Sequence, residues 1–298
     1  MRILVPDVMT PASLEIMARS HEVIYEPTLA ADLPALLRAA RDSHCMIVRN
    51  RIQVRGELLD AMTQCRVLGR LGVGLDNIDL EGCKARGIQV IPATGANALA
   101  VAEWVVCAAM MLLRPWYAAS AGVAAGQWPR APLTQGREIA GKTLGIVGYG
   151  SVGRETGRLA GALGMKSIAC DLNASAQGLS SFDDVLAHSD VITLHMPLTE
   201  TTRNLFDAKT LAKMKPGAIL VNAARGGIVD EAALAQALHA GHLGGAAIDV
   251  FAQEPLGAGS ALADAPNLLL APHIAGVTQE SETRVCELIA RRVVEALS

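Results

Sequence analysis

The chain has 298 residues, of which 51% are hydrophobic, and its formal net charge is -3. This length suffices for two domains of ordinary size, and the hydrophobic fraction excludes a chain that is disordered throughout. The slightly acidic balance gives no general attraction to nucleic acid or to an anionic membrane. We therefore expect the partners to be small molecules and a second copy of the chain.

The six cysteines are scattered and form no C-x-x-C pair. This pattern is typical of reduced core thiols in a cytoplasmic protein, and it predicts neither a disulfide framework nor a metal site. The first ten residues lack the apolar core of a secretory signal. The most apolar stretch, residues 98–113, is shorter than a bilayer requires and contains Glu103, so we interpret it as a buried helix.

Apolar runs alternate with helical patterns from residue 1 to about residue 92. The predicted strands are ILV, EVIY, CMIV, RVLGRL and IQVI, and the predicted helices are PASLEIMARS, DLPALLRAA, RGELLDAMTQ and IDLEGCKA. Thr10 is placed to cap the first helix and Gly87 to end the last. This alternation predicts a parallel sheet with helices on both faces and ligands at the carboxyl ends of its strands, near residues 48–51 and 69–79.

The middle of the chain begins with the apolar helix at residues 98–113. An irregular segment follows over residues 114–141, rich in alanine, glycine and proline, and we interpret it as an arm outside the sheet. From Lys142 a second β/α series begins. Its predicted strands are LGIVGYG, SIACD, VITLHM, AILVNAA, AAIDVF and NLLLAPH.

The last residues form an amphipathic helix that is predicted to pack on the first domain. We therefore predict one domain from residues 1–97 plus 282–298 and another from residues 98–281. The two crossings, near Asn97 and Ser281, are expected to form a hinge over a cleft.

The second series opens with a glycine-rich turn, Gly148, Gly150 and Gly153 in the spacing G-x-G-x-x-G, between a strand and a helix. The first glycine allows a tight turn, the second a close approach of the backbone to a pyrophosphate, and the third close packing of helix on strand. Asp171 ends the next strand, where an acidic residue receives the ribose hydroxyls. Residues 172–177 supply no lysine or arginine for a 2'-phosphate. The cofactor is therefore predicted to be NAD.

Polar residues follow three later strands, and with them a family resemblance becomes plain. The stretches are NAARGGIVDE with Arg225, AAIDVFAQEP with Asp249 and Glu254, and LLLAPHIAG with His273. With the runs LHMPLTETTRNLF and TGANALAVAEW, they occur in the order found in D-isomer-specific 2-hydroxyacid dehydrogenases. The chain resembles this family from residue 48 to about residue 278. The resemblance implies an α/β protein of two doubly wound parallel-sheet domains, one Rossmann-type for NAD and one flavodoxin-like for substrate.

The resemblance also implies the catalytic residues. Reduction of a 2-oxo acid delivers a hydride to the carbonyl carbon and a proton to the oxygen, so a positively charged donor is needed there. His273 is the implied acid/base, and Glu254 is the partner that holds its ring. Arg225 is the implied fork that binds the substrate carboxylate and polarises the carbonyl.

The resemblance extends to other site residues. Asp249 is left between two interpretations, a contact to the nicotinamide amide or a strand cap, and His195 is implied beside the nicotinamide ribose. The implied cofactor residues are Gly148, Gly150, Ser151, Val152, Gly153, Asp171, His195, Pro197, Thr202, Ala223, Arg225, Asp249, His273 and Gly276. The implied substrate residues are Arg49, Asn50, Val73 and Gly74.

The substrate is predicted to carry a second anionic group. Arg49 and Arg51 are expected near one wall without partners, where they would repel each other, and Arg130 in the arm could add a third cation. This favours a sulfolactate-like or phosphoglycerate-like substrate. If Arg51 and Arg130 are solvated or paired, a hydroxypyruvate or glyoxylate reductase is the alternative.

Two departures from the family pattern affect this prediction. The wall sequence reads VRNRI where the family often has V-R-S-x-T, and no regulatory domain follows; both weaken a phosphoglycerate assignment. An NAD-sensing corepressor-like protein is the alternative of another class. The short chain without partner-binding tails favours an enzyme.

A homodimer is predicted through the helix at residues 98–113 and the arm. An apolar helix and two tryptophans, Trp116 and Trp128, make a surface that a monomer is not expected to expose. The family resemblance implies a subunit contact in the same place.

Overall fold

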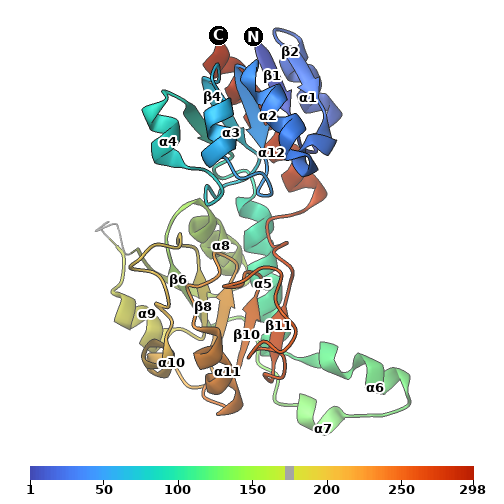
Figure 1. The fold of residues 1–298 in the computed structure, drawn as a ribbon. Helices are drawn as coiled ribbons and strands as arrows, with labels where there is room; N and C mark the ends of the chain where they lie inside the picture. The colour runs from blue at the N-terminus through green and yellow to red at the C-terminus, as the bar shows by residue number, and fades with distance from the viewer. Residues whose placement is uncertain (172–177) are drawn as a thin grey trace. The chain divides into compact units, whose positions relative to one another are not determined.

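The computed structural model describes residues 1–171 and 178–298 (Figure 1). The chain divides into two units. Unit 1 contains Met1–Asn97 and Val277–Ser298, and unit 2 contains Ala98–Gly276.

The chain returns to unit 1 at Val277, earlier than the predicted boundary after Ser281. The reason is a capping box before helix α12 (Gln279–Leu297): Thr278 accepts a hydrogen bond from the Ser281 N–H, and the Ser281 hydroxyl accepts one from the Thr278 N–H. The helix therefore starts at residue 279, and it packs on helix α1 (Pro11–Ala18) and strand β4 (Val67–Arg70) of unit 1.

The sheet of unit 1 has five parallel strands in the order β2-β1-β3-β4-β5. The strands are β1 (Arg2–Val5), β2 (Glu22–Tyr25), β3 (Cys45–Val48), β4 (Val67–Arg70) and β5 (Gln89–Pro92). Each overlaps a predicted apolar run, and β3 and β4 are fully buried, as central strands of a parallel sheet are. The strand order is that of flavodoxin, and ligands of such sheets bind where the order reverses, here beside the carboxyl ends of β1 and β3.

Helices cover both faces of this sheet (Figure 1). They are α1 (Pro11–Ala18), the 3-10 helix η1 (Pro27–Ala31), α2 (Leu33–Arg41), α3 (Gly56–Ala61) and α4 (Leu80–Ala85). Neighbouring strand residues point to opposite cores: Met46 packs under α2 to α4, and Ile47 packs under α1 and α12. Thr10 stands before α1 as predicted, but its hydroxyl contacts the Ser13 hydroxyl and caps no backbone N–H.

The sheet of unit 2 has six parallel strands in the order β11-β10-β9-β8-β6-β7. The strands are β6 (Thr143–Val147), β7 (Lys166–Cys170), β8 (Val191–Leu194), β9 (Ile219–Asn222), β10 (Gly245–Ile248) and β11 (Leu268–Leu270). The order reverses between β6 and β8, which places the glycine-rich turn after β6 at the switch point of the sheet. The predicted strands and the doubly wound fold are confirmed.

The helices of unit 2 also lie on both faces. They are α5 (Ala98–Leu113), α8 (Ser151–Ala162), α9 (Phe182–His188), α10 (Ala208–Lys213) and α11 (Glu231–His239). The alternation along β9 shows the two cores: Ile219 and Val221 pack with α5 and α8, whereas Leu220 packs with α9 to α11. The buried apolar helix predicted at residues 98–113 is confirmed.

The arm, residues 114–141, projects from unit 2 (Figure 1). It is less irregular than predicted, because its alanine-rich stretches form η2 (Trp116–Ala119), α6 (Ser120–Ala124) and α7 (Arg130–Leu133). At its base, Tyr117 donates to Asn267 at 3.4 Å and Arg137 Nη2 donates to the Gly217 carbonyl at 2.9 Å. These acceptors precede β11 and β9, so the arm leaves unit 2 at the amino edge of the sheet.

In the described part of the chain, no single helix has the length and apolar character needed to cross a membrane.

Candidate active site

The glycine-rich turn of unit 2 has backbone contacts that leave no room for a side chain at Gly148 or Gly153. Gly148 has φ +96°, and a Cβ there would lie 2.6 Å from the His195 carbonyl oxygen. A Cβ on Gly153 would lie 2.3 Å from the Gly148 carbonyl, so α8 packs directly on the turn. At Gly150 nothing lies within 4 Å of such a Cβ. That open side, before the N–H groups of the twelve-residue helix α8, fits a pyrophosphate.

Asp171 lies beside this turn. Its Oδ2 accepts a hydrogen bond from the Tyr149 N–H at 3.0 Å, which holds the carboxylate at the end of β7. This is the position expected for an acidic residue that binds ribose hydroxyls. The run at residues 172–177, on which part of the prediction of NAD over NADP depended, lies outside the described residues.

His195 lies against the glycine-rich turn. Its Nε2 lies 3.1 Å from the Thr193 hydroxyl and 3.4 Å from the Thr156 hydroxyl. The ring is enclosed although part of the residue reaches the surface, and burial lowers the pKa of His195 to about 3. Its ring therefore joins β8 to α8 as a neutral group, and its carbonyl faces Gly148.

Four further predicted cofactor residues lie on loops after strands of this sheet. Pro197 is exposed after β8, and Thr202 holds it by donating to the Pro197 carbonyl at 2.8 Å. Thr202 is itself buried, so it supports the loop. Ala223 follows β9 and is half-buried. Gly276 is the last residue of unit 2.

Arg225 lies on a loop that a buried asparagine shapes. The Asn222 side chain accepts from the Ala224 N–H at 3.1 Å and donates to the Arg225 carbonyl at 3.0 Å. The next residue, Gly226, touches the Phe251 backbone so closely that a Cβ would lie 1.7 Å from its carbonyl oxygen. The loop after β9 therefore packs on the loop after β10. Asn222 was not predicted as a site residue; its only signal is a polar residue at the end of an apolar run.

Glu254 and His273 form the predicted pair. Glu254 Oε1 accepts from the Phe251 N–H at 3.0 Å, and Oε2 lies 2.8 Å from His273 Nδ1. Because an ionised carboxylate only accepts hydrogen bonds, Nδ1 carries a proton and Nε2 is the nitrogen left to meet a substrate. The His273 side chain is 47% exposed, so a ligand can reach it.

Asp249 holds the backbone that follows His273. Its two oxygens accept from the Ile274 and Ala275 N–H groups, both at 2.8 Å. His273 itself has φ +57°, a left-handed conformation that is uncommon outside glycine. Burial raises the pKa of Asp249, and the two backbone hydrogen bonds oppose that effect. The structure favours a backbone clamp over the other predicted interpretation, a contact to the nicotinamide amide.

The predicted substrate residues of unit 1 lie at the carboxyl edge of its sheet. Arg49 and Asn50 follow β3, and Val73 and Gly74 follow the neighbouring strand β4. Asn77 was missed as a structural residue of this edge. Its buried side chain donates to the Arg49 carbonyl at 2.9 Å and to the Ile52 carbonyl at 2.7 Å, and so joins the two loops.

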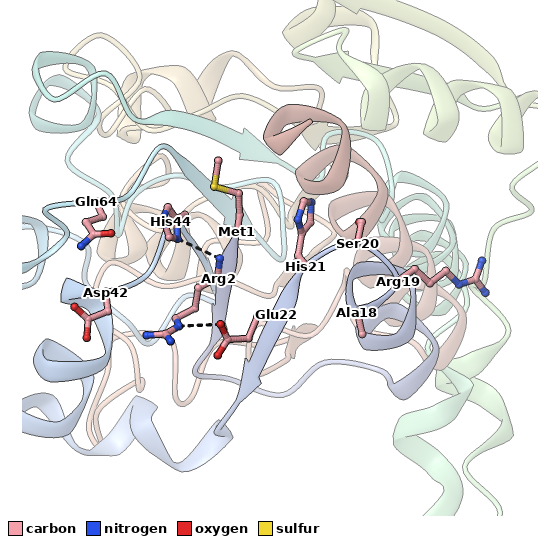
Figure 2. Close-up of a pocket in the computed structure, with 10 residues that line it drawn as sticks. All are labelled: Met1, Arg2, Ala18, Arg19, Ser20, His21, Glu22, Asp42, His44 and Gln64. Carbon is pink, nitrogen blue, oxygen red and sulfur yellow. Dashed lines mark hydrogen bonds and ion pairs between the residues drawn. The ribbon is translucent and has the colours of Figure 1, made fainter.

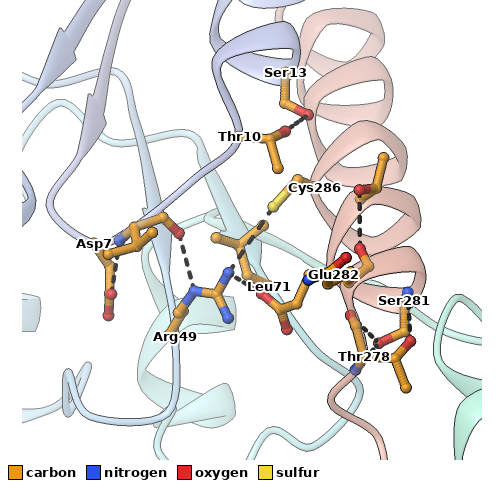
Figure 3. Close-up of polar contacts among 12 residues, drawn as sticks. Asp7, Thr10, Ser13, Arg49, Leu71, Thr278, Ser281, Glu282 and Cys286 are labelled. Carbon is orange, nitrogen blue, oxygen red and sulfur yellow. Dashed lines mark hydrogen bonds and ion pairs between the residues drawn. The ribbon is translucent and has the colours of Figure 1, made fainter.

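Arg49 has an acidic partner, contrary to the prediction. Its Nη2 forms an ion pair with Glu282 of α12, and its Nε donates to the Val8 carbonyl at 3.0 Å (Figure 3). The prediction of two unpaired arginines was therefore wrong for Arg49. The pairing joins residues 233 positions apart, so no local pattern could indicate it.

Arg51 follows Arg49 and Asn50 in the same loop but lines a hollow that neither of them lines, and Arg130 lies in the arm. Arg51 is exposed and lines a hollow of about 380 Å³ with Leu33 of α2 and Leu58 of α3. Arg130 begins α7 in the arm, which leaves unit 2 at the amino edge, whereas Arg225 follows the carboxyl end of β9. Arg130 therefore lies away from the catalytic residues of its own unit.

Unit 1 carries another hollow, of about 690 Å³, lined by polar groups that include Arg2, His21, Glu22 and His44 (Figure 2). Arg2 opens β1 and Glu22 opens β2, so this hollow lies at the amino edge of the sheet. It is thus at the opposite edge from Arg49.

Comparison with known proteins agrees with this geometry. A model of the "D-isomer specific 2-hydroxyacid dehydrogenase, NAD binding domain" matches residues 106–275. The chain is 43% identical to (S)-sulfolactate dehydrogenase of Chromohalobacter salexigens, over 99% of this chain and 98% of that protein. It is 36% identical to D-3-phosphoglycerate dehydrogenase of Archaeoglobus fulgidus, over 99% of this chain but 57% of that protein. The chain thus spans about half the length of the phosphoglycerate dehydrogenases that it matches.

A solved structure shows the same fold. The glyoxylate reductase from Paecilomyes thermophila has a TM-score of 0.88 and 30% identity, over 100% of this chain and 95% of that one. The predicted fold class, oxidoreductase activity and NAD cofactor are confirmed. The chain belongs to the D-isomer-specific 2-hydroxyacid dehydrogenase family.

Proposed function

We propose that the chain interconverts a small D-configured 2-hydroxy acid and its 2-oxo acid, and that this acid carries a second anionic group. The observation that supports this reaction is the Glu254–His273 pair at one edge of the sheet. The loop that carries Glu254 packs on the loop that carries Arg225. Bound NADH would supply the hydride to the carbonyl carbon. Gly148, Gly150 and Asp171 would hold it, because they leave an open backbone cradle and a fixed carboxylate.

The residues of the chain supply the proton and the charge. Protonated His273 would donate from Nε2 to the carbonyl oxygen while Glu254 holds Nδ1. Arg225 would hold the substrate carboxylate and stabilise the developing negative charge with a planar, bidentate guanidinium. In the oxidation direction, neutral His273 would accept the hydroxyl proton.

For the substrate we favour sulfolactate and sulfopyruvate over phosphoglycerate. Support comes from the 43% identity to a protein called (S)-sulfolactate dehydrogenase, which this chain matches over nearly its whole length. The phosphoglycerate dehydrogenases are less similar to this chain, at 36% and 35% identity. The S label does not conflict with a D-specific enzyme, because sulfur raises the priority of the side-chain carbon and the arrangement remains that of a D-2-hydroxy acid.

A hydroxypyruvate or glyoxylate reductase is the second candidate, and two observations favour it. Arg49 is already paired with Glu282, and Arg130 lies on the arm away from the catalytic residues. Only Arg51 then keeps the predicted role of an exposed cation near the substrate loop.

The deciding experiment compares kcat/KM for sulfopyruvate, phosphohydroxypyruvate, hydroxypyruvate and glyoxylate, in wild type and in Arg51→Ala. We expect sulfopyruvate to be preferred and the preference to shrink in the variant. Arg38→Ala is a matched control, since Arg38 lies on α2 and does not line the hollow around Arg51. Equal activity on singly charged acids, unaffected by Arg51→Ala, would exclude a second anionic group.

We propose NAD over NADP because a 2'-phosphate would meet the Asp171 carboxylate, which the Tyr149 N–H fixes in place. The kcat/KM with NADH should exceed that with NADPH. Asp171→Ala should bring the two kcat/KM values closer together. A higher kcat/KM with NADPH in wild type would contradict this proposal.

We also propose a homodimer formed through α5 and the arm. A hollow of about 840 Å³, lined mainly by apolar side chains of α5, α8 and the arm, lies there. Met110 is 45% exposed, Trp116 64% and Trp128 79%. Light scattering should give twice the chain mass of 31.1 kDa, and Met110→Glu should lower it. A wild-type mass of one chain at micromolar concentration would contradict the dimer.

A cytoplasmic location is proposed as well. All six cysteines are free thiols and five are buried, as expected in a reducing compartment.

A further inference from the structure

The ion pair of Arg49 and Glu282 lies at the carboxyl edge of the unit 1 sheet, at the loop predicted to bind the substrate. Arg49 directly follows β3, and its side chain is 22% exposed; that of Glu282 is 30% exposed. Such a half-buried pair is less screened by solvent than a surface pair, so its charges interact more strongly.

Further hydrogen bonds hold both partners in place. The backbone carbonyl of Arg49 accepts a hydrogen bond from the Asn77 side chain, and the Nε of the Arg49 side chain donates one to the Val8 carbonyl. Glu282 lies in the first turn of α12, and its N–H bonds to the Thr278 carbonyl at 2.9 Å. The two side chains therefore meet because the end of β3 and the start of α12 are held in place, as Figure 3 shows.

Glu282 compensates the positive charge of the Arg49 guanidinium. Burial alone would lower the pKa of Arg49, yet the hydrogen bond and charge of Glu282 outweigh it, and the pKa is raised. An incoming anion therefore meets a neutralised pair. It gains from Arg49 only if the carboxylate of Glu282 gives way.

We propose that Glu282 is a specificity-determining residue: it competes with the second anionic group of the substrate for Arg49. This inference rests on the proposed function and deepens it. Glu282 thereby sets the preference between singly and doubly charged 2-oxo acids.

The test is Glu282→Gln, which removes the charge and keeps a hydrogen-bond acceptor and nearly the same volume. Sulfopyruvate and pyruvate are the paired substrates, because they differ by one sulfonate. We expect the KM for sulfopyruvate to fall by about 3- to 10-fold relative to that for pyruvate, as expected for one half-buried charge. Glu280→Gln is the matched control, since Glu280 lies in the same helical turn, is exposed and makes no contact with Arg49.

A double variant assigns the effect to the pair. In an Arg49→Gln background, Glu282→Gln should no longer change the ratio of the two KM values. If Glu282→Gln lowers the melting temperature too far for kinetics, Glu282→Asp, which keeps the charge but shortens the side chain, should shift the ratio in the same direction. An unchanged ratio, or an equal effect in the Arg49→Gln background, would overturn the inference. Failure of the proposed function would differ: wild type would oxidise NADH with neither acid.

Discussion

The two units present similar groups at the carboxyl edges of their sheets but use their carboxylates differently. In unit 2, Glu254 and Asp249 hold the ring and the backbone of His273, so the catalytic group is oriented before any ligand binds. In unit 1, Glu282 neutralises Arg49, so the cation proposed for the substrate is already occupied.

This difference suggests that the two units have separate roles, with the reaction carried by unit 2 and the choice of substrate by unit 1. In the proposed mechanism the groups that act on the carbonyl, Arg225, Glu254 and His273, all lie in unit 2, and they would serve any 2-oxo acid. The groups that would distinguish substrates depend on a displaceable ion pair in unit 1. Variants in unit 2 should therefore change kcat, whereas variants of the ion pair should change KM in a way that depends on substrate charge.

The largest effect is expected for His273→Ala, which tests whether unit 2 carries the chemistry. Turnover should fall by about 10²- to 10⁴-fold, the usual contribution of general acid catalysis, because the variant lacks the proposed proton donor. NADH binding, measured by fluorescence titration, should be nearly unchanged. His239→Ala, at an exposed position on α11, is the control. Retention of most of the turnover would remove His273 from the mechanism.

Asp249→Asn tests the backbone clamp. An amide offers one acceptor, so either the Ile274 or the Ala275 N–H would face its NH2 group and lose a hydrogen bond. We expect kcat to fall on the order of 10- to 100-fold, as when a catalytic group is misplaced by about 1 Å. Steady-state kinetics and melting curves check this. Asp207→Asn is the control, because asparagine caps a helix about as well as aspartate, and this variant at the N-cap of α10 should keep its kcat.

Glu254→Gln tests the orientation of the ring with a smaller effect. An amide can still accept from Nδ1, but the hydrogen bond is no longer assisted by a negative charge. This difference is worth about 1.4 kcal/mol, so we expect kcat for reduction to fall about 10-fold. Steady-state kinetics of both proteins decide this. An unchanged kcat would mean that Glu254 only positions the ring.

The predictions from sequence succeeded where one local pattern determines the result. The spacing of Gly148, Gly150 and Gly153 requires a turn between strand and helix, and polar residues after parallel strands meet at one edge. Arg225, Glu254 and His273 were predicted on this basis and from the family resemblance, and the structure places them on adjacent loops.

The rest depends on tertiary contacts that no local pattern encodes. The partner of Arg49 lies in the last helix, and its pairing depends on how α12 crosses the sheet. The place of Arg130 depends on the edge at which the arm leaves unit 2. Asn77 and Asn222 were missed for a similar reason: a buried amide that shapes a loop looks like any polar loop residue until its partners are known.

The smallest effect is expected for His195, which lies against the glycine-rich turn. Burial lowers the pKa of His195 to about 3, below the ordinary value of 6.5, so the unfolded chain binds a proton at this residue between those pH values and the folded chain does not. His195 therefore contributes stability that is complete above pH 6.5 and is lost as the pH falls toward 3, by at most about 1.4 kcal/mol per pH unit. Gln can bond to the same two threonines but cannot be protonated, so in His195→Gln the free energy of unfolding should fall less steeply between pH 7 and pH 4. Urea unfolding at several pH values measures both slopes, with His188→Gln, at an exposed end of α9, as the control. If the free energy of unfolding changes with pH equally in wild type and in His195→Gln, the His195 ring is not held neutral in the folded protein.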